Sequence, residues 1–187
     1  MSNCGEEWGM HYIKCFSGHK FHFLDCKLIK KSLSIREGGK LHMFIGQYTY
    51  SLDAKGRVVI PPKYREELGE EFVISKGMDG CLRIYTTDAW QDFCNKLSAL
   101  PQTSKDARHF ARFFLAGANS LEPDKQGRVL IPQVLREFAS LEKDVMIIGV
   151  NNYVEIWDVN KYDEVNDISE EELDEISEKM FENGFIL

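Results

Sequence analysis

An aspartate and an arginine recur at the same spacing in two stretches of the chain. The first stretch reads SLDAKGRVVIPPKYRE, and about seventy residues later the chain reads LEPDKQGRVLIPQVLRE. Both contain a D-x-x-x-R pattern, at Asp53 and Arg57 and again at Asp124 and Arg128. The carboxylate and the guanidinium can brace a turn as an ion pair. The guanidinium can instead donate hydrogen bonds to phosphates and base edges of nucleic acid. The motif alone leaves both interpretations open.

The glycine before each arginine indicates a tight reversal of the backbone. Gly56 and Gly127 are expected to adopt a conformation that other residues resist. Asp53 and Asp124 are expected to accept backbone hydrogen bonds across the same turns. These four residues are therefore predicted to form the turn brace of each motif.

Extra cations distinguish the first copy of the motif from the second. Lys55 and Lys63 occupy positions where the second copy has Gln126 and Val134. A basic turn of this kind can contact the phosphates of DNA. The predicted DNA-binding residues are Lys55, Arg57, Lys63, Arg65 and Arg128.

The duplication extends over two whole modules rather than over one motif. Alternating apolar residues, prolines and glycines predict the same order of elements in both halves. In the first half we expect strands at 44–52, 57–60, 72–75 and 82–85 and helices at 63–68 and 88–97. After a helix at 105–115, the second half repeats strands at 118–121, 128–131, 145–150 and 153–157, with a short helix opened by Pro132. The predicted boundaries are 43–99 and 100–162 for the modules and 163–187 for an acidic helical tail.

The distribution of charge permits a DNA-binding face despite the net charge of −7. Between Asp163 and Glu182 the tail holds ten acidic residues and one lysine, which accounts for the acidity of the whole chain. The body is close to neutral, and its basic residues gather around the repeats. We expect the tail to form an amphipathic helix with an apolar stripe of Ile168, Leu173, Ile176, Met180 and Phe181 that packs on the body or on a neighbouring subunit.

Residues 1–42 differ from the rest and are interpreted as a loose leader or as a non-native extension. Gly38 and Gly39 can be encoded by a ribosome-binding sequence, and Met43 follows at a spacing suited to initiation. The native protein is therefore hypothesised to begin at Met43. The leader also contains Cys15, His19, His22 and Cys26, but their spacing matches no common zinc site, and no metal is predicted.

The sequence favours neither an enzyme nor a membrane protein. It has no Walker motif and no GxGxxG, and neither a cofactor nor a small-molecule substrate is predicted. His109 lies in a helical stretch, and Cys81 and Cys94 have no base beside them in the sequence. No apolar run approaches the roughly 20 residues of a membrane span. Five scattered cysteines suit a reducing cytoplasm.

The paired phrases, together with MFIGQYTYSLD and GVNNYVEIWD, closely resemble the MraZ family from Met43 to about Glu178. The family has AbrB-like swapped-hairpin modules, so the resemblance implies an α+β fold in which two tandem modules form one pseudo-dimeric β-barrel with flanking helices. It implies a transcriptional regulator in the cytoplasm and nucleoid that binds double-stranded DNA, at repeated promoter boxes of the division and cell-wall gene cluster. It also implies a ring-shaped homo-oligomer. The alternative is an AbrB-like antitoxin whose acidic tail binds a protein partner.

Overall fold

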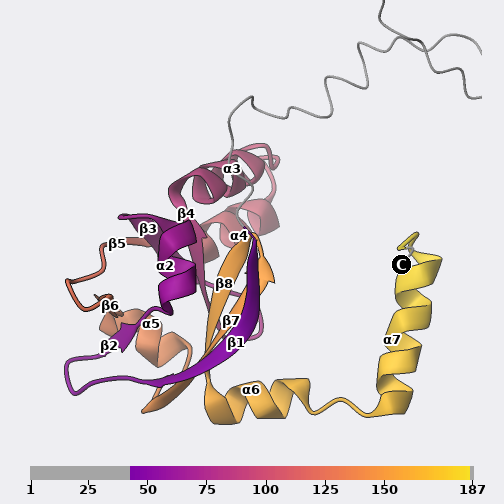
Figure 1. Cartoon of the computed structure of the whole chain (residues 1–187). Coiled ribbons are helices and arrows are strands. Elements are labelled where there is room, and N and C mark those ends of the chain that lie inside the picture. Colours follow the sequence, from indigo (N-terminus) through magenta and orange to yellow (C-terminus); the bar gives the residue numbers. More distant parts are fainter. Residues whose placement is uncertain (1–42, 186–187) are drawn as a thin grey trace, which may run out of the picture. The chain divides into compact units, whose positions relative to one another are not determined.

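The computed structural model describes residues 43–185 (Figure 1). The leader, the start-site hypothesis and its Cys and His residues lie outside the described residues. The first repeat comprises β1 (Phe44–Ser51), β2 (Arg57–Val59), α2 (Pro62–Leu68), β3 (Phe72–Lys76), β4 (Leu82–Thr86) and α3 (Thr87–Ser98). A connecting helix, α4 (Lys105–Leu115), leads into the second repeat. That repeat comprises β5 (Asn119–Leu121), β6 (Arg128–Leu130), α5 (Gln133–Phe138), β7 (Asp144–Asn151), β8 (Tyr153–Asp158) and α6 (Val159–Asn166), and α7 (Glu170–Glu182) follows it.

The strands and short helices expected from the duplication are present, and α6, which was not among the expected elements, crosses the predicted boundary between residues 162 and 163. Each repeat runs through two strands, a short helix, two strands and a further helix. Proline opens both short helices, because a helix needs no amide donor in its first turn and tolerates proline there. Gly69, at a φ of 84°, ends α2 with a backbone conformation that few other residues adopt.

Each repeat pairs its first strand with the other repeat. The six-stranded sheet has the order β1-β7-β8-β4-β3-β5, and all its pairings are antiparallel. Strand β1 of the first repeat therefore pairs with β7 of the second, and β5 of the second pairs with β3 of the first (Figure 1). Because the first strands are exchanged, neither repeat completes its own part of the sheet.

Equivalent residues of the two repeats meet at two places, which reveals an internal pseudo-twofold relationship. In the two-stranded sheet β2–β6, Val58 lies opposite Val129, its counterpart in the duplication. In the centre of the large sheet, Arg83 of β4 lies opposite Glu155 of β8, which is again its counterpart. The fold is thus a mixed α and β structure arranged about an axis between its two repeats.

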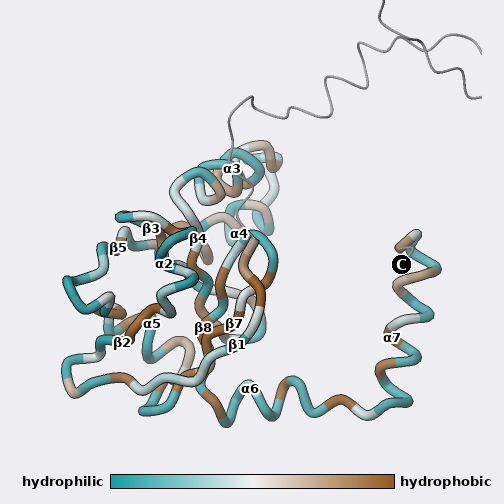
Figure 2. Tube along the Cα trace, viewed as in Figure 1, coloured by the Kyte–Doolittle hydropathy of each residue, from teal (hydrophilic) through white to brown (hydrophobic). Residues whose placement is uncertain are grey.

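Both repeats contribute to one hydrophobic core. Their strands and short helices bury side chains such as Phe72, Ile84, Ile147 and Ile156 completely. Figure 2 shows hydrophobic residues along the central strands, whereas hydrophilic residues predominate on α6 and α7. Each large apolar side chain removed from water contributes about 1.5–3 kcal/mol. A shared core of this kind makes the stability of one repeat depend on the other.

A chain that ends at Ala99 should not behave as a folded monomer. It retains β1, β3 and β4 but lacks their partners β7, β5 and β8, so apolar faces and unpaired strand edges are exposed. We expect aggregation or a strand-exchanged dimer when the shortened chain is analysed by light scattering and circular dichroism. A monomer with native-like spectra would mean that the repeats fold independently.

The pair at the pseudo-twofold position should matter for stability. Arg83 Nη2 lies 3.0 Å from Glu155 Oε1, and the two side chains are only 21% and 12% exposed. Glu155 also accepts a hydrogen bond from Trp157 Nε1 at 2.9 Å. Placing like charges at this point, by Arg83→Glu or Glu155→Arg, should lower the free energy of unfolding by about 2–4 kcal/mol.

The exchanged double variant, Arg83→Glu with Glu155→Arg, provides the control. It restores opposite charges but not the acceptor for Trp157, so urea denaturation should show partial recovery and a favourable coupling energy. Additive losses in the double variant would contradict a direct interaction.

Candidate nucleic-acid interface

The first D-x-x-x-R turn is closed by its own aspartate. Asp53 Oδ1 accepts hydrogen bonds from the amides of Lys55 and Arg57, both at 2.9 Å. Its other oxygen, Oδ2, accepts from Arg57 Nε at 2.7 Å and lies 2.7 Å from Arg57 Nη2. Gly56 adopts a φ of 77°, the left-handed conformation expected for the reversal. The pairing of Asp53 with Arg57 therefore holds the guanidinium in one orientation beside the turn.

The second turn has the same geometry. Asp124 Oδ1 accepts from the amides of Gln126 and Arg128 at 2.9 and 3.0 Å. Asp124 Oδ2 accepts from Arg128 Nε at 2.9 Å and lies 2.8 Å from Arg128 Nη2. Gly127 has a φ of 75°. The two turns thus repeat the same hydrogen bonds and the same left-handed glycine conformation at Asp53, Gly56, Asp124 and Gly127.

Backbone hydrogen bonds between the repeats place the two turns side by side. The Ile60 amide donates to the Gly127 carbonyl, and the Ile131 amide donates to the Gly56 carbonyl, both at 3.0 Å. Arg57 Nη1 also lies 3.7 Å from Asp124 Oδ2 of the other turn. Two elements far apart in the sequence thereby form one surface that carries both motifs.

Arg65 and Arg136 are each anchored in their own repeat and lie against the turn of the other repeat. Arg65 Nε donates to the Ile60 carbonyl and Arg136 Nε to the Ile131 carbonyl, both at 3.1 Å. The guanidinium of Arg65 lies where a side chain on Gly127 would project, and that of Arg136 lies in the same way against Gly56. The glycines thus permit close approach as well as a tight turn. Arg65, predicted to bind DNA, lies half-buried in this structural position, and its contact with DNA stays a prediction.

Both motif aspartates are held in the ionised form. The backbone amide of Arg57, followed by its guanidinium, lowers the pKa of Asp53 to about 2. The guanidinium of Arg128, followed by its amide, lowers the pKa of Asp124 to about 2. Ionised carboxylates that already accept several hydrogen bonds are suited to positioning an arginine rather than to transferring protons.

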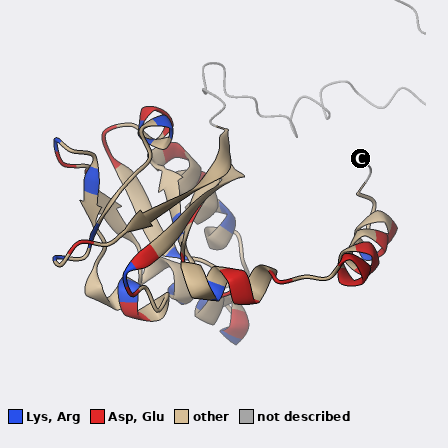
Figure 3. Ribbon diagram, turned by 60° about the horizontal axis from the view of Figure 1, so that its bottom comes forward, with Lys and Arg blue, Asp and Glu red and all other residues tan. Residues whose placement is uncertain are grey.

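The lysines around the turns are free to approach a polyanion. Lys55 and Lys63 are exposed, and their contact with phosphates stays a prediction. Lys125, which is also exposed, lies in the second turn beside Gln126 and was not among the predicted residues. It occupies the position of Ala54 rather than of Lys55, so a position-by-position comparison of the repeats does not reveal it. Figure 3 shows basic residues at the loop tips and acidic residues on α7.

The cysteines and histidine considered for catalysis have surroundings that suit other roles. Burial raises the pKa of the Cys81 thiol to about 12 and also raises that of Cys94, which keeps both thiols protonated at neutral pH. His109 is exposed on α4. Within residues 43–185, no cluster of His, Cys, Asp and Glu suitable for a metal ion is found.

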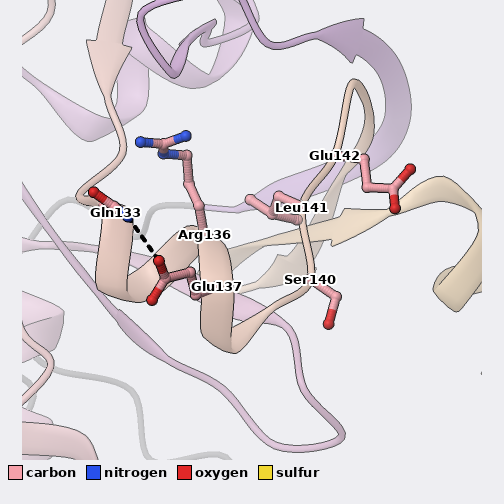
Figure 4. Close-up of a pocket in the computed structure, with 6 residues that line it drawn as sticks. All are labelled: Gln133, Arg136, Glu137, Ser140, Leu141 and Glu142. Carbon is pink, nitrogen blue, oxygen red and sulfur yellow. Dashed lines mark hydrogen bonds between the residues drawn. The ribbon is translucent and has the colours of Figure 1, made fainter.

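A surface hollow beside α5 is lined mainly by polar groups (Figure 4). Its residues are Gln133, Arg136, Glu137, Ser140, Leu141 and Glu142. Gln133 Nε2 donates to Glu137 Oε1 at 2.7 Å, so two of these side chains satisfy each other. Small-molecule sites are typically concave and mostly apolar, and this hollow does not have that character.

Membrane insertion through a helix is not supported for the described part of the chain. Every helix there is too short or too polar to cross a bilayer.

The fold and its paired turns define a class: a duplicated module whose halves exchange strands and present two ion-paired turns on one surface. Comparison with known proteins agrees with the duplication. The family model described as "MraZ protein, putative antitoxin-like" matches twice, at residues 43–113 and 114–184.

Known relatives align with this chain over nearly the whole of their own length. The transcriptional regulator MraZ of Acetivibrio thermocellus is 54% identical over 138 residues, covering 74% of this chain and 96% of the relative. The proteins of the same name from Alkaliphilus oremlandii and Clostridium tetani are 53% and 50% identical over 142 residues, covering 76% of this chain and 99% of each relative. The chain belongs to the MraZ family, which confirms the resemblance seen in the sequence. The relatives are named as transcriptional regulators, a non-enzymatic class, in agreement with the prediction that this protein is not an enzyme.

The lowered pKa values of the turn aspartates predict a specific dependence of stability on pH. An unfolded aspartate has a pKa of about 4. Since the folded values are about 2, the ionised pairs stabilise the fold fully above about pH 4 and lose this contribution as the pH falls towards 2. A variant with Asp53→Asn and Asp124→Asn should be less stable at pH 7 and should lose less stability between pH 4 and pH 2.

Urea denaturation at a series of pH values measures this difference. The double substitution Glu70→Gln and Glu164→Gln, at two exposed carboxylates, is matched in charge and serves as the control. Parallel pH profiles for the aspartate variant and the original chain would contradict the assignment.

Proposed function

We propose that this protein is a sequence-specific DNA-binding transcriptional regulator that uses the two adjacent D-x-x-x-R turns to contact promoter DNA. The observation that carries the proposal is the placement of two congruent turns on one surface by reciprocal hydrogen bonds between the repeats. The family relationship and the names of the relatives support a role in transcription.

Each turn combines a fixed arginine with an exposed lysine, Lys55 in the first turn and Lys125 in the second. Arg57 and Arg128 are about 28% and 29% exposed, so part of each guanidinium remains available while the aspartate fixes its plane. A fixed arginine fork suits bidentate donation to a guanine edge. Exposed Lys55, Lys63 and Lys125 suit phosphates, whose contacts position a protein on DNA without reading its sequence.

The proposal extends to the fold and the assembly. The exchange of first strands between repeats supports a swapped-hairpin barrel in which one chain takes the place of a dimer. We further propose that copies assemble into a ring, and that the ring engages repeated boxes near the division and cell-wall genes, in the cytoplasm and nucleoid. Several weak contacts in one assembly then act together through effective concentration.

The alternative proposal, an antitoxin-like protein, rests on α7. This helix is acidic and exposes several apolar side chains, as a segment that wraps a protein partner would. A stoichiometric unrelated protein that co-purifies with the full chain would favour this alternative over a self-assembling regulator.

Substitutions at the turns test whether the arginines read bases. Binding is measured at matched salt to duplexes containing the promoter boxes and to a scrambled duplex. Arg57→Ala should cost about 1–3 kcal/mol for each contact made. Arg128→Ala should cost less, because the first turn has Lys55 and nearby Lys63 beside its arginine whereas the second turn has Lys125. Lys55→Ala should weaken binding to both duplexes equally and make the salt dependence shallower by about one phosphate contact.

Arg57→Lys separates reading from bracing, because it keeps the charge but removes the fork. We expect it to lower the preference for the promoter duplex more than the affinity for the scrambled one, and thermal melts check that the variant folds. If the preference for the promoter duplex is unchanged by Arg57→Lys and by Arg128→Lys, the motif is a structural brace only. A larger loss in Arg128→Ala than in Arg57→Ala would assign the reading role to the second turn.

A further inference from the structure

Helix α4 presents a basic surface to solvent. Its inner side is apolar: Phe114 is 2% exposed, and its ring lies 5.2 Å from that of Phe93 between centroids. Its outer side carries Lys105, Arg108, His109 and Arg112, all of them exposed. This basic surface is separate from the D-x-x-x-R turns, since α4 packs on β3 while the turns adjoin β2 and β6.

Local hydrogen bonds hold the two arginines of this surface along the helix. Arg108 Nη1 donates to the carbonyls of Gln102 and Thr103 at 2.7 and 3.0 Å, and Arg112 Nε donates to the Arg108 carbonyl at 3.0 Å. These partners are neutral, so the positive charge of both groups is not neutralised by them. Two apolar side chains, Phe110 at 43% and Leu115 at 45% exposed, border the basic residues.

Helix α7 has the complementary character. Ser169 and Glu172 form a capping box at its start, which satisfies backbone amides of the first turn. It contains seven acidic residues and one lysine. Leu173, Ile176 and Met180 fall on one face at helical spacing and are 55%, 41% and 47% exposed. None of its residues is buried against the described part of the chain. The predicted apolar stripe therefore exists, but it does not pack on the body of its own chain.

A helix as short and as exposed as α7 is expected to need a packing partner. A helix of 13 residues is marginally stable in water on its own, and most helical stability comes from packing an apolar face. Its length of about 20 Å is close to the roughly 16 Å of α4. The two helices are thus similar in length and opposite in charge, and each has apolar side chains beside its charged ones.

The connection to α6 argues against docking on the α4 of the same chain. Helix α6 packs against β7 and β8, whereas α4 packs against β3, on the far side of β4 in the sheet order. Only Asp167, Ile168 and Ser169 separate α6 from α7. Three residues span at most about 10 Å, which restricts the region that α7 can reach from α6.

We propose that α7 of one copy docks along α4 of a second copy of this chain, with the acidic residues of α7 beside Arg108 and Arg112 and the two apolar borders in contact. Such a contact joins two different surfaces, so it continues from copy to copy and closes into a ring when the rotation permits. The inference rests on the proposed function insofar as it names the contact that builds the proposed ring.

Charge reversal on either helix should break the assembly. The full-length chain should be a discrete multi-copy oligomer by light scattering. Two α4 substitutions, Arg108→Glu with Arg112→Glu, should weaken self-association at least about 100-fold, because like charges then face each other. Two α7 substitutions, Asp174→Lys with Glu178→Lys, should also weaken self-association, because the two added lysines then lie beside Arg108 and Arg112.

Recombining the reversed helices restores complementarity. A chain that carries all four substitutions should assemble again, since the two carboxylates added on α4 then lie beside the two lysines added on α7. A mixture of the α4 variant and the α7 variant should form alternating mixed oligomers, although each variant alone does not assemble. Rescue of this kind cannot arise from simple misfolding of either variant.

Other outcomes overturn the proposal. Full assembly of the α4 variant, failure of the four-substitution chain and of the mixture to reassemble, or a monomeric original chain would each do so. A co-purifying unrelated protein that is lost on changing α7 would assign the helix to a different partner.

Binding of a duplex with one promoter box is measured in parallel. If that binding persists while assembly is unaffected by the reversals, the docking contact is wrong and the DNA-binding proposal stands. If the reversals on α4 abolish only this binding, α4 contacts DNA instead.

Discussion

The amide of Ile60 donates to the carbonyl of Gly127, and the amide of Ile131 donates to the carbonyl of Gly56. These reciprocal hydrogen bonds join the two motif turns directly through the backbone. The pairing of β2 with β6 sets their register by placing Val58 opposite Val129. Because backbone groups make these bonds, the relative position of the two turns does not depend on the side chains that differ between them. The shared core then fixes the turns to the rest of the fold.

Joining the repeats in one chain allows equivalent positions to diverge. In a dimer of identical modules, the residue at the position of Arg83 would face a copy of itself. Here Arg83 faces Glu155, and the guanidinium also lies 4.4 Å from the ring centroid of Tyr153. A favourable ion pair thus occupies a point where exact symmetry would produce repulsion. The same freedom lets Lys55 in one turn correspond to Gln126 in the other.

Asymmetry also separates the surfaces of the molecule by charge. The motif turns combine ion-paired arginines with exposed lysines, α4 is basic, and α7 is acidic. An acidic helix is repelled by DNA, so it is better suited to contact a basic protein surface than to extend the proposed DNA-binding face.

Much of the local structure could be predicted from the sequence, because it depends on residues close together in the chain. Alternating apolar residues located the strands, Pro61 and Pro132 marked the starts of the short helices, and the D-x-x-x-R spacing indicated the braced turns. Arg65 shows where this reasoning stopped. Its place against Gly127 of the other repeat depends on long-range packing, and its contact with DNA stays a prediction.

By itself, the sequence determined the duplication, the order of the elements and the identity of the braced turns, since local hydrogen bonds and hydrophobic periodicity govern these features. Only the tertiary structure decided that β1 pairs with β7 and β5 with β3, and that Arg83 meets Glu155. It also decided that the stripe on α7 remains exposed. These outcomes depend on long-range pairing, in which strands of similar apolar pattern compete for the same edges and the best joint packing of both repeats selects the partner.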